Sequence, residues 1–287
     1  MRSVLRRAAA YGRMIRFSHS VFALPFALTS AVLAGRLGGV TAGQIAWIVV
    51  AMVAARSAAM GFNRLADHAI DARNPRTARR ELPRGVLSRR EVWAFVVLSA
   101  AVFVLAAGML NPLCLALSPV ALLVVLGYSY TKRFTAASPL VLGLSLAIAP
   151  VGAWLAIRGR FEPFPIGLAL AVLLWVAGFD TIYASQDAEF DRREGLRSIP
   201  ASLGVPRALA VARGLHVGAG LALLGLYWLA PLHPLYLVGV AVVASLLAWE
   251  HTLVRPDDLS RVMQAFNLNG WVSLGYLAFT AAAAFLA

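Results

Sequence analysis

The sequence predicts an all-α, polytopic membrane protein with nine transmembrane helices. Of its 287 residues, 60% are hydrophobic and only 14% are charged, whereas a soluble domain typically carries about 25% charged residues. The length accommodates nine spans of about 20 residues each, joined by short loops. Because this leaves no room for a separate soluble domain, we expect a single transmembrane domain over residues 1–287.

Nine apolar segments follow one another along the chain. Gly or Pro interrupts several of them, which membrane helices tolerate where neighbouring helices satisfy the freed backbone groups. The predicted segments are residues 19–36, 43–66, 92–110, 112–130, 139–157, 164–186, 208–230, 234–252 and 269–287. The seventh is the weakest, because Arg213 and His216 lie near its start.

Basic residues concentrate in alternate loops. Twenty of the 26 Lys and Arg lie in the N-terminal segment and in the loops after the second, fourth, sixth and eighth segments. The loops on the opposite side contain only Arg36, Arg158 and Arg160. This distribution follows the positive-inside rule and predicts a cytoplasmic N-terminus. It also explains most of the net charge of +13, so we expect membrane lipid rather than nucleic acid as a partner.

Two acidic motifs lie at the ends of the second and sixth segments, each after a Gly-Phe pair. The first consists of Asn63, Asp67 and Asp71, and the second of Asp180, Tyr183, Asp187 and Asp191. Because residues three or four apart share one helix face, we expect each set on one face of a helix. Their matched places, four segments apart, suggest an internal duplication and put both sets on the cytoplasmic side.

The chemistry of these motifs favours a divalent metal ion. Carboxylates at helix C-termini meet the negative end of the helix dipole, so an anion needs a cation in between. Oxygen ligands with open positions suit Mg²⁺, which commonly bridges carboxylates to substrate phosphates. The five histidines form no recognisable cluster, and no phosphate-binding glycine loop exists. A solvated helix end would explain one acidic motif, but two at matched places favour a magnesium site for a diphosphate.

The motifs resemble the N-x-x-x-D-x-x-x-D and D-x-x-x-D patterns of the UbiA superfamily of intramembrane prenyltransferases. Residues 73–85 and 194–200 also resemble its 4-hydroxybenzoate polyprenyltransferase-like branch, including members assigned to futalosine-route menaquinone synthesis. The resemblance covers essentially the whole chain. It implies nine helices in a horseshoe around a central cavity open to lipid, in a bacterial inner membrane, with the active site on the cytoplasmic side.

The resemblance also implies roles for the acidic residues. Asn63, Asp67, Asp71, Asp187 and Asp191 are expected to hold two Mg²⁺ ions against a polyprenyl diphosphate. Asp67, Asp187 and Asp191 are expected to be catalytic, and Asp191 matches the position proposed to orient the acceptor or take its proton. Neutralising the diphosphate would assist cleavage of the allylic C–O bond, and a water-poor cavity would protect the resulting cation.

Further substrate contacts are expected from nearby side chains. Lys132 and Arg133 end the fourth segment on the side of both acidic motifs, so they are either diphosphate ligands or ordinary positive-inside residues. Arg64 lies within the first motif but off its acidic face, and can point either way. Asp180 and Tyr183 lie deeper than the other acids of the second motif and are expected to line the cavity.

Arg56 lies seven residues before Asn63 and shares its helix face. An arginine inside a membrane span requires a partner. The expected partner is either a carboxylate of the acceptor or a structural acid such as Asp180.

The leading interpretation is magnesium-dependent transfer of a polyprenyl group to 4-hydroxybenzoate or a related quinone precursor, in ubiquinone or menaquinone biosynthesis. Haem, homogentisate and chlorophyllide are alternative acceptors within the family. A transporter for a cation or a phosphate compound is the alternative from another class. Transporters usually place ion ligands near the membrane midplane between inverted repeats, whereas these acids lie at one face.

Overall fold

The computed structural model describes residue 7, residues 10–15 and residues 22–287, which are almost entirely helical. In these residues eight helices are long and apolar enough to cross a membrane. The first predicted segment, 19–36, begins outside the described residues, and its described part is the 15-residue helix α2 (Leu24–Gly38). The all-α membrane class is confirmed, and the count of nine spans stays a prediction.

The remaining helices follow the predicted order. The long ones are α3 (Ala42–Ala66), α5 (Arg89–Leu110), α6 (Pro112–Gly127), α7 (Ser138–Arg158), α8 (Pro163–Ala184), α11 (Val205–Gly225), α12 (Leu235–Leu253) and α13 (Val262–Leu286). The short ones are α4 (His68–Arg73), η2 (Tyr128–Arg133), η3 (Ser185–Asp187), α9 (Ala188–Arg193), α10 (Ile199–Leu203) and η4 (Leu226–Trp228). Helix α13 begins seven residues before the predicted segment because its first turn is buried against Leu209 and Leu253.

Local sequence signals fix several helix starts. Ser88 and Glu91 form a reciprocal capping box at the start of α5, which satisfies two backbone N–H groups that have no partner inside the helix. The side chain of Asn111 accepts a hydrogen bond from the backbone N–H of Cys114, and Pro112 occupies the first position of α6. Asn111 is therefore the single residue between α5 and α6.

The helices form two compact units. The first unit contains residues Ala46–Tyr130 and the N-terminal residues up to Ser20, and the second contains Val21–Ile45 and Thr131–Ala287. In the first unit, Leu82 and Leu87 of the loop between α4 and α5 are buried in one hydrophobic cluster with Val92. This arginine-rich loop is therefore anchored to the helices. The expected single domain over residues 1–287 stays a prediction.

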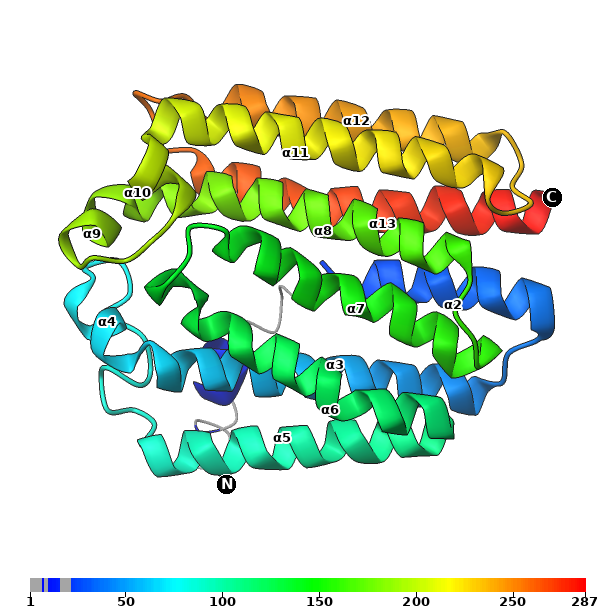
Figure 1. The fold of residues 1–287 in the computed structure, drawn as a ribbon, viewed down its shortest axis with the longest axis horizontal. Helices are drawn as coiled ribbons and strands as arrows, with labels where there is room; N and C mark the ends of the chain where they lie inside the picture. Colours follow the sequence, from blue (N-terminus) through cyan, green and yellow to red (C-terminus); the bar gives the residue numbers. More distant parts are fainter. Residues whose placement is uncertain (1–6, 8–9, 16–21) are drawn as a thin grey trace. The chain divides into compact units, whose positions relative to one another are not determined.

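The second unit is a closed bundle of six helices. Helices α2, α7, α8, α11, α12 and α13 each pack against the next, and α13 packs back against α2 (Figure 1). Helix α8 also contacts α13 and α2, and it belongs to the most deeply buried of the candidate spans. Pro150 interrupts the hydrogen bonding of α7, and Ser30 of α2 donates to its carbonyl oxygen at 2.6 Å. The central position of α8 matters because α8 leads directly into the second acidic motif.

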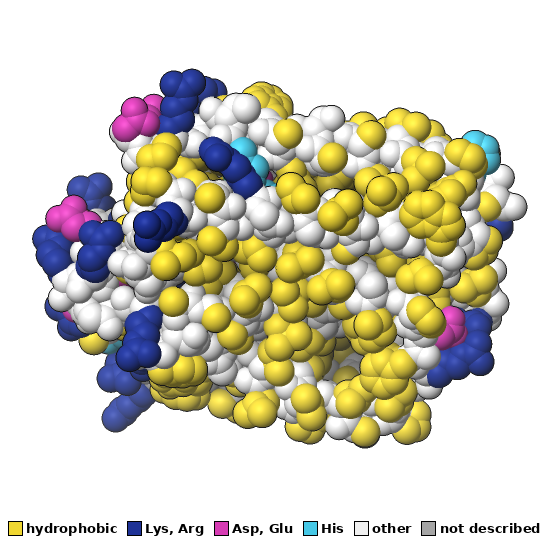
Figure 2. All heavy atoms as spheres, turned by 45° about the horizontal axis from the view of Figure 1, so that its top comes forward, with side chains coloured by type: hydrophobic (Ala, Val, Ile, Leu, Met, Phe, Trp, Pro, Cys, Tyr) yellow, Lys and Arg dark blue, Asp and Glu magenta, His cyan; other side chains and the backbone are white. Residues whose placement is uncertain are grey.

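The outward faces of the second unit are apolar. Val217 and Leu221 on α11 and Val238 and Trp249 on α12 are exposed. Figure 2 shows hydrophobic side chains along the sides of these helices, with Lys and Arg gathered toward their ends. Such a largely apolar surface, which the exposed Arg213 interrupts on α11, suits contact with lipid.

Candidate functional site

The structure interrupts both motif helices at an aspartate. Helix α3 ends at Ala66 and α4 begins at His68, with Asp67 between them at φ −94° and ψ 8°. In the second motif, the turn η3 separates α8 from α9, and Asp187 precedes α9 at φ −103° and ψ 4°. The predicted segments 43–66 and 164–186 end directly before these two aspartates, but the sequence did not indicate the breaks. The matching geometry makes Asp67 equivalent to Asp187 and Asp71 equivalent to Asp191.

This equivalence changes how the two motifs align. Counting back four residues from the central aspartates pairs Asn63 with Tyr183, so Asp180 has no counterpart in the first motif. With the central aspartates aligned, the two Gly-Phe pairs differ in position by three residues. In the structure the glycine of each pair has a packing role. A Cβ atom on Gly61 would press against Val96 of α5. One on Gly178 would overlap a histidine ring of α11.

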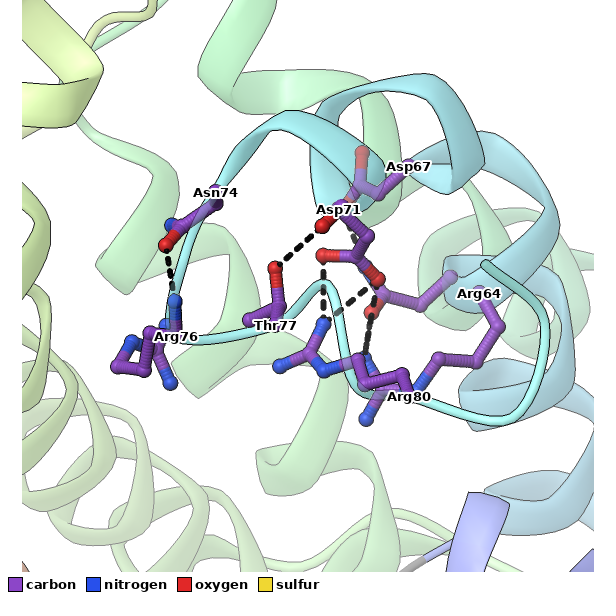
Figure 3. Close-up of polar contacts among 8 residues, drawn as sticks. Arg64, Asp67, Asp71, Asn74, Arg76, Thr77 and Arg80 are labelled. Atoms are coloured by element: carbon purple, nitrogen blue, oxygen red, sulfur yellow. Dashed lines mark hydrogen bonds and ion pairs between the residues drawn. The ribbon is translucent and has the colours of Figure 1, made fainter. Parts of the chain in front are cut away.

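The first motif forms a hydrogen-bonded cluster within the first unit (Figure 3). The amide nitrogen of Asn63 donates to the carboxylate of Asp67 at 3.0 Å. The amide oxygen of Asn63 accepts a hydrogen bond of 3.3 Å from Arg64. Despite the break, the backbone N–H groups of Asp67 and Asp71 still donate to the carbonyls four residues earlier, at 2.9 and 2.7 Å. The structure therefore brings all three predicted metal-binding side chains of this motif together.

Asp71 is held by two arginines. One terminal nitrogen of Arg80 lies 2.7 Å from both carboxylate oxygens, and a terminal nitrogen of Arg64 lies 3.9 Å from one of them. The side chains of Arg64 and Asp71 are only 6% and 7% exposed, so water screens this contact weakly. Arg64 thus points toward the carboxylates, which settles its direction. A metal ion arriving here would share the carboxylate of Asp71 with these arginines, whereas a diphosphate would share the arginines with Asp71.

The loop after α4 positions Arg80. The hydroxyl of Thr77, which is 2% exposed, donates to the backbone carbonyl of Asp71 at 3.1 Å. The side chain of Asn74 accepts from the backbone N–H of Arg76 at 2.9 Å and tightens the turn. Figure 3 shows the loop folding back so that Arg80 faces the carboxylate of Asp71. The sequence indicated only that this loop is basic, because no periodic pattern links residues across an irregular turn.

The second motif lies within the second unit. Asp187 and Asp191 are buried, and Asp180 is close enough for its charge to interact with theirs and with that of Lys132. Tyr183 packs against Phe266 of α13, with ring centroids 4.9 Å apart. The predicted acids of this motif are therefore close together.

The 3₁₀-helix η2 carries Lys132 and Arg133. The residues that follow α9, Leu196 and Arg197, form a strap that holds η2 in place. The backbone N–H of Arg197 donates to the carbonyl of Lys132 at 2.7 Å, and its guanidinium donates to the carbonyl of Phe134 at 2.8 Å. The N–H of Leu196 donates to the carbonyl of Asp191 at 2.8 Å. The strap therefore links the cations of η2 to the acids of the second motif. The sequence marked residues 194–200 by resemblance but did not reveal this contact.

Arg56 lies on α3 about 10 Å deeper than Asn63, at 1.5 Å per residue. Its Nε atom is buried without a hydrogen-bond partner in the described chain. Among the described residues of the first unit it forms no ion pair with a carboxylate. Asp180 belongs to the second unit, so both expected partners, a carboxylate of the acceptor and a structural acid such as Asp180, stay predictions.

The donor chemistry of the two motifs fits magnesium. Nowhere in the described residues do three or more His, Cys, Asp or Glu side chains approach closely enough to form a metal cage. Mg²⁺ does not need such a cage, because it is usually bound by one or two carboxylates, substrate phosphates and water. Each motif offers oxygen donors of this kind, Asn63 with Asp67 and Asp71, and Asp187 with Asp191.

Comparison with known proteins adds independent findings. The sequence model of the UbiA prenyltransferase family matches residues 23–281. A 4-hydroxybenzoate octaprenyltransferase of Azoarcus sp. (strain BH72) is 31% identical over 233 residues, covering 80% of this chain and 79% of that protein.

Two solved structures share the arrangement of helices. The apo structure of a UbiA homolog from Aeropyrum pernix K1 superposes with a TM-score of 0.83 and 35% identity, over 91% of this chain and 96% of that one. A UbiA homolog from Archaeoglobus fulgidus, bound to DMAPP and Mg²⁺, has a TM-score of 0.73 and 19% identity, over 96% and 99% of the two chains.

Proposed function

Because this chain belongs to the UbiA prenyltransferase family and is a membrane-integral prenyltransferase, we propose that it transfers a polyprenyl group from a polyprenyl diphosphate to 4-hydroxybenzoate or a related aromatic acid, with Mg²⁺ as cofactor. The observation that carries this proposal is the repeated helix break at Asp67 and Asp187, each followed four residues later by a buried aspartate. The Mg²⁺ and DMAPP bound to the Archaeoglobus homolog support it.

In this proposal the residues divide into four roles. Asn63, Asp67, Asp71, Asp187 and Asp191 hold the metal, and bound Mg²⁺ neutralises charge on the departing diphosphate. The basic side chains that assist the diphosphate are Arg64, Arg80, Lys132 and Arg133, of which Arg64 and Arg80 already face a carboxylate. Asp180 and Tyr183 line the path of the substrate. Asp191 takes the ring proton or orients the acceptor.

The acceptor is proposed to be an acid because of Arg56. The guanidinium of Arg56 is partly buried in a span and has no carboxylate partner within the first unit, although such a charge requires one. The carboxylate of 4-hydroxybenzoate supplies that partner, and its electron-rich ring then attacks the allylic carbon. The Azoarcus relative named as a 4-hydroxybenzoate octaprenyltransferase supports this choice. We place the reaction in quinone biosynthesis, in a bacterial inner membrane, with the acidic motifs on the cytoplasmic side.

The test is product analysis with purified protein. A long-chain prenyl diphosphate and Mg²⁺ are incubated with a panel of aromatic acceptors, and the products are identified by mass spectrometry. We expect prenylated 4-hydroxybenzoate or a related acid, no product with EDTA, and poor use of phenols that lack the carboxylate. Prenylation of a haem, homogentisate or chlorophyllide acceptor in preference to an aromatic monoacid would contradict the proposal.

A further inference from the structure

Five polar residues from four helices, termed the polar ring, are linked by hydrogen bonds inside the second unit. The polar ring consists of Trp175 on α8, His216 on α11, Glu250 and His251 on α12 and Asn269 on α13. The indole N–H of Trp175 donates to Asn269 at 2.6 Å, and the amide nitrogen of Asn269 donates to Glu250 at 3.2 Å. On the other side His216 lies 3.0 Å from His251 and 3.2 Å from the carbonyl oxygen of Trp175. The sequence analysis was wrong to treat these histidines as isolated.

The hydrogen bonds of the polar ring all run in one direction. An indole N–H only donates, so the oxygen of Asn269 must face Trp175 and its nitrogen must face Glu250. A carbonyl only accepts, so Nε2–H of His216 donates to Trp175. In the neutral ring Nδ1 then accepts, which makes His251 the donor to His216. The polar ring thus contains two head-to-tail series that meet at Trp175, one ending at its backbone carbonyl and one starting at its indole N–H, and within each series the bonds strengthen one another.

Stability alone does not account for the polar ring. Glu250 is 1% exposed, and its Oε2 atom has no hydrogen-bond partner in the described residues. Polar groups in a membrane span are costly, and well-packed apolar replacements for such groups are often neutral or stabilising. The feature that the polar ring does determine is geometric, because Trp175 is fixed by its side chain from α13 and by its backbone from α11. Two attachments at one residue define both the rotation and the axial position of α8.

We propose that the polar ring positions the second acidic motif by fixing the rotation of α8; this inference rests on the proposed function. Asp180 and Tyr183 follow Trp175 on the same helix by five and eight residues. A rotation of about 20° displaces a side chain at a helix radius of about 5–6 Å by about 2 Å. A displacement of about 1 Å at a reacting centre already costs up to about 100-fold in rate. The absence of a Cβ on Gly178 allows His216 to reach α8.

The test replaces three side chains of the polar ring together by apolar ones. The variant Trp175→Phe/Glu250→Met/Asn269→Leu removes donors and acceptors together, so no new unsatisfied group is created. We expect an unfolding temperature in detergent close to that of the wild type. We also expect a 10- to 100-fold lower kcat and clearly weaker binding of Mn²⁺ in the presence of a non-reactive prenyl thiodiphosphate, followed by the EPR signal of free Mn²⁺.

The control is Tyr236→Phe, which removes buried hydrogen bonds to Leu223 and Tyr276 of the same unit but touches no part of the polar ring. It should change thermal stability without changing Mn²⁺ binding or kcat. A folded triple variant with the Mn²⁺ affinity and kcat of the wild type would overturn the inference. A wild type that forms no prenylated product refutes the proposed function instead.

If the triple variant does not fold, a pair of single variants at the side-chain attachment of Trp175 decides. Asn269→Asp keeps an oxygen that accepts from Trp175, whereas Asn269→Leu removes it. We expect wild-type Mn²⁺ binding in the first and weakened binding in the second. Equal Mn²⁺ binding in both variants would overturn the inference.

Discussion

Replacing Arg56 by leucine should change stability and function in opposite directions. Scales of membrane insertion put the cost of an arginine at the centre of a span at about 2.5–3.5 kcal/mol. Arg56 lies partly buried on α3 and has no carboxylate partner within the first unit, so part of this cost is present in the folded protein. We therefore expect Arg56→Leu to be as stable as the wild type or more stable.

Arg56→Leu should weaken binding of the acceptor. A hydrogen bond to a charged group contributes about 1.5–3 kcal/mol, which corresponds to about 10- to 150-fold in affinity. The acceptor KM should rise by this factor for 4-hydroxybenzoate, while the KM for the prenyl diphosphate stays constant. A phenol without a carboxylate should be used equally well by wild type and variant, because it never engages the guanidinium.

Initial rates in detergent and thermal unfolding of the same preparations provide the measurement. Arg213→Leu is the matched control, because Arg213 also lies in a span but is exposed on α11. It should leave the acceptor KM unchanged. A loss of stability of about 3–5 kcal/mol in Arg56→Leu would show that Arg56 has a partner within the protein. An unchanged acceptor KM would refute the assignment of Arg56 to the acceptor.

Three further outcomes are expected. Asp67→Ala and Asp187→Ala should each reduce product formation by at least about 100-fold at saturating Mg²⁺, measured by mass spectrometry, and product at wild-type rate from either would exclude that residue from the metal site. Arg80→Leu should destabilise the protein by about 3 kcal/mol, because it leaves a buried carboxylate without its closest cation, whereas an unchanged unfolding temperature would show that this ion pair contributes nothing. Gly178→Ala should lower the free energy of unfolding by about 1–3 kcal/mol, because the added Cβ overlaps the histidine ring of α11. Gly220→Ala, whose added Cβ meets no atom within 4 Å, should leave stability unchanged or increase it. Equal unfolding temperatures of the two variants would contradict the packing role of Gly178.

The sequence predicted the parts of this protein that depend on regular periodicity. Long apolar runs gave the positions of the helices, and the spacing of the acids gave two sets of candidate ligands, because helix geometry makes residues four apart neighbours. The breaks at Asp67 and Asp187 were not predictable in this way. A single residue with φ and ψ near −100° and 5° changes neither composition nor spacing.

Contacts between distant segments could also not be predicted from the sequence. Arg80 reaches Asp71 across an irregular turn, and the pairing of His216 with His251 joins residues on two different helices. No local signal specifies which residues of neighbouring helices face each other, since that depends on how side chains pack. For the same reason the sequence indicated a buried arginine at position 56 but left its partner open between substrate and protein.

The 3₁₀ turn Ser185–Asp187 explains how two motifs of unequal length keep the same geometry. The second motif has three more residues than the first between Gly-Phe and its central aspartate. In an α-helix three extra residues would rotate everything downstream by about 300° and turn the acids to another side. In a 3₁₀-helix they complete one full turn of about 360°, and η3 has three residues. A three-residue insertion or deletion at this point is thus rotationally silent, so the two motifs can differ in length while each acid pair keeps its direction relative to its own helix.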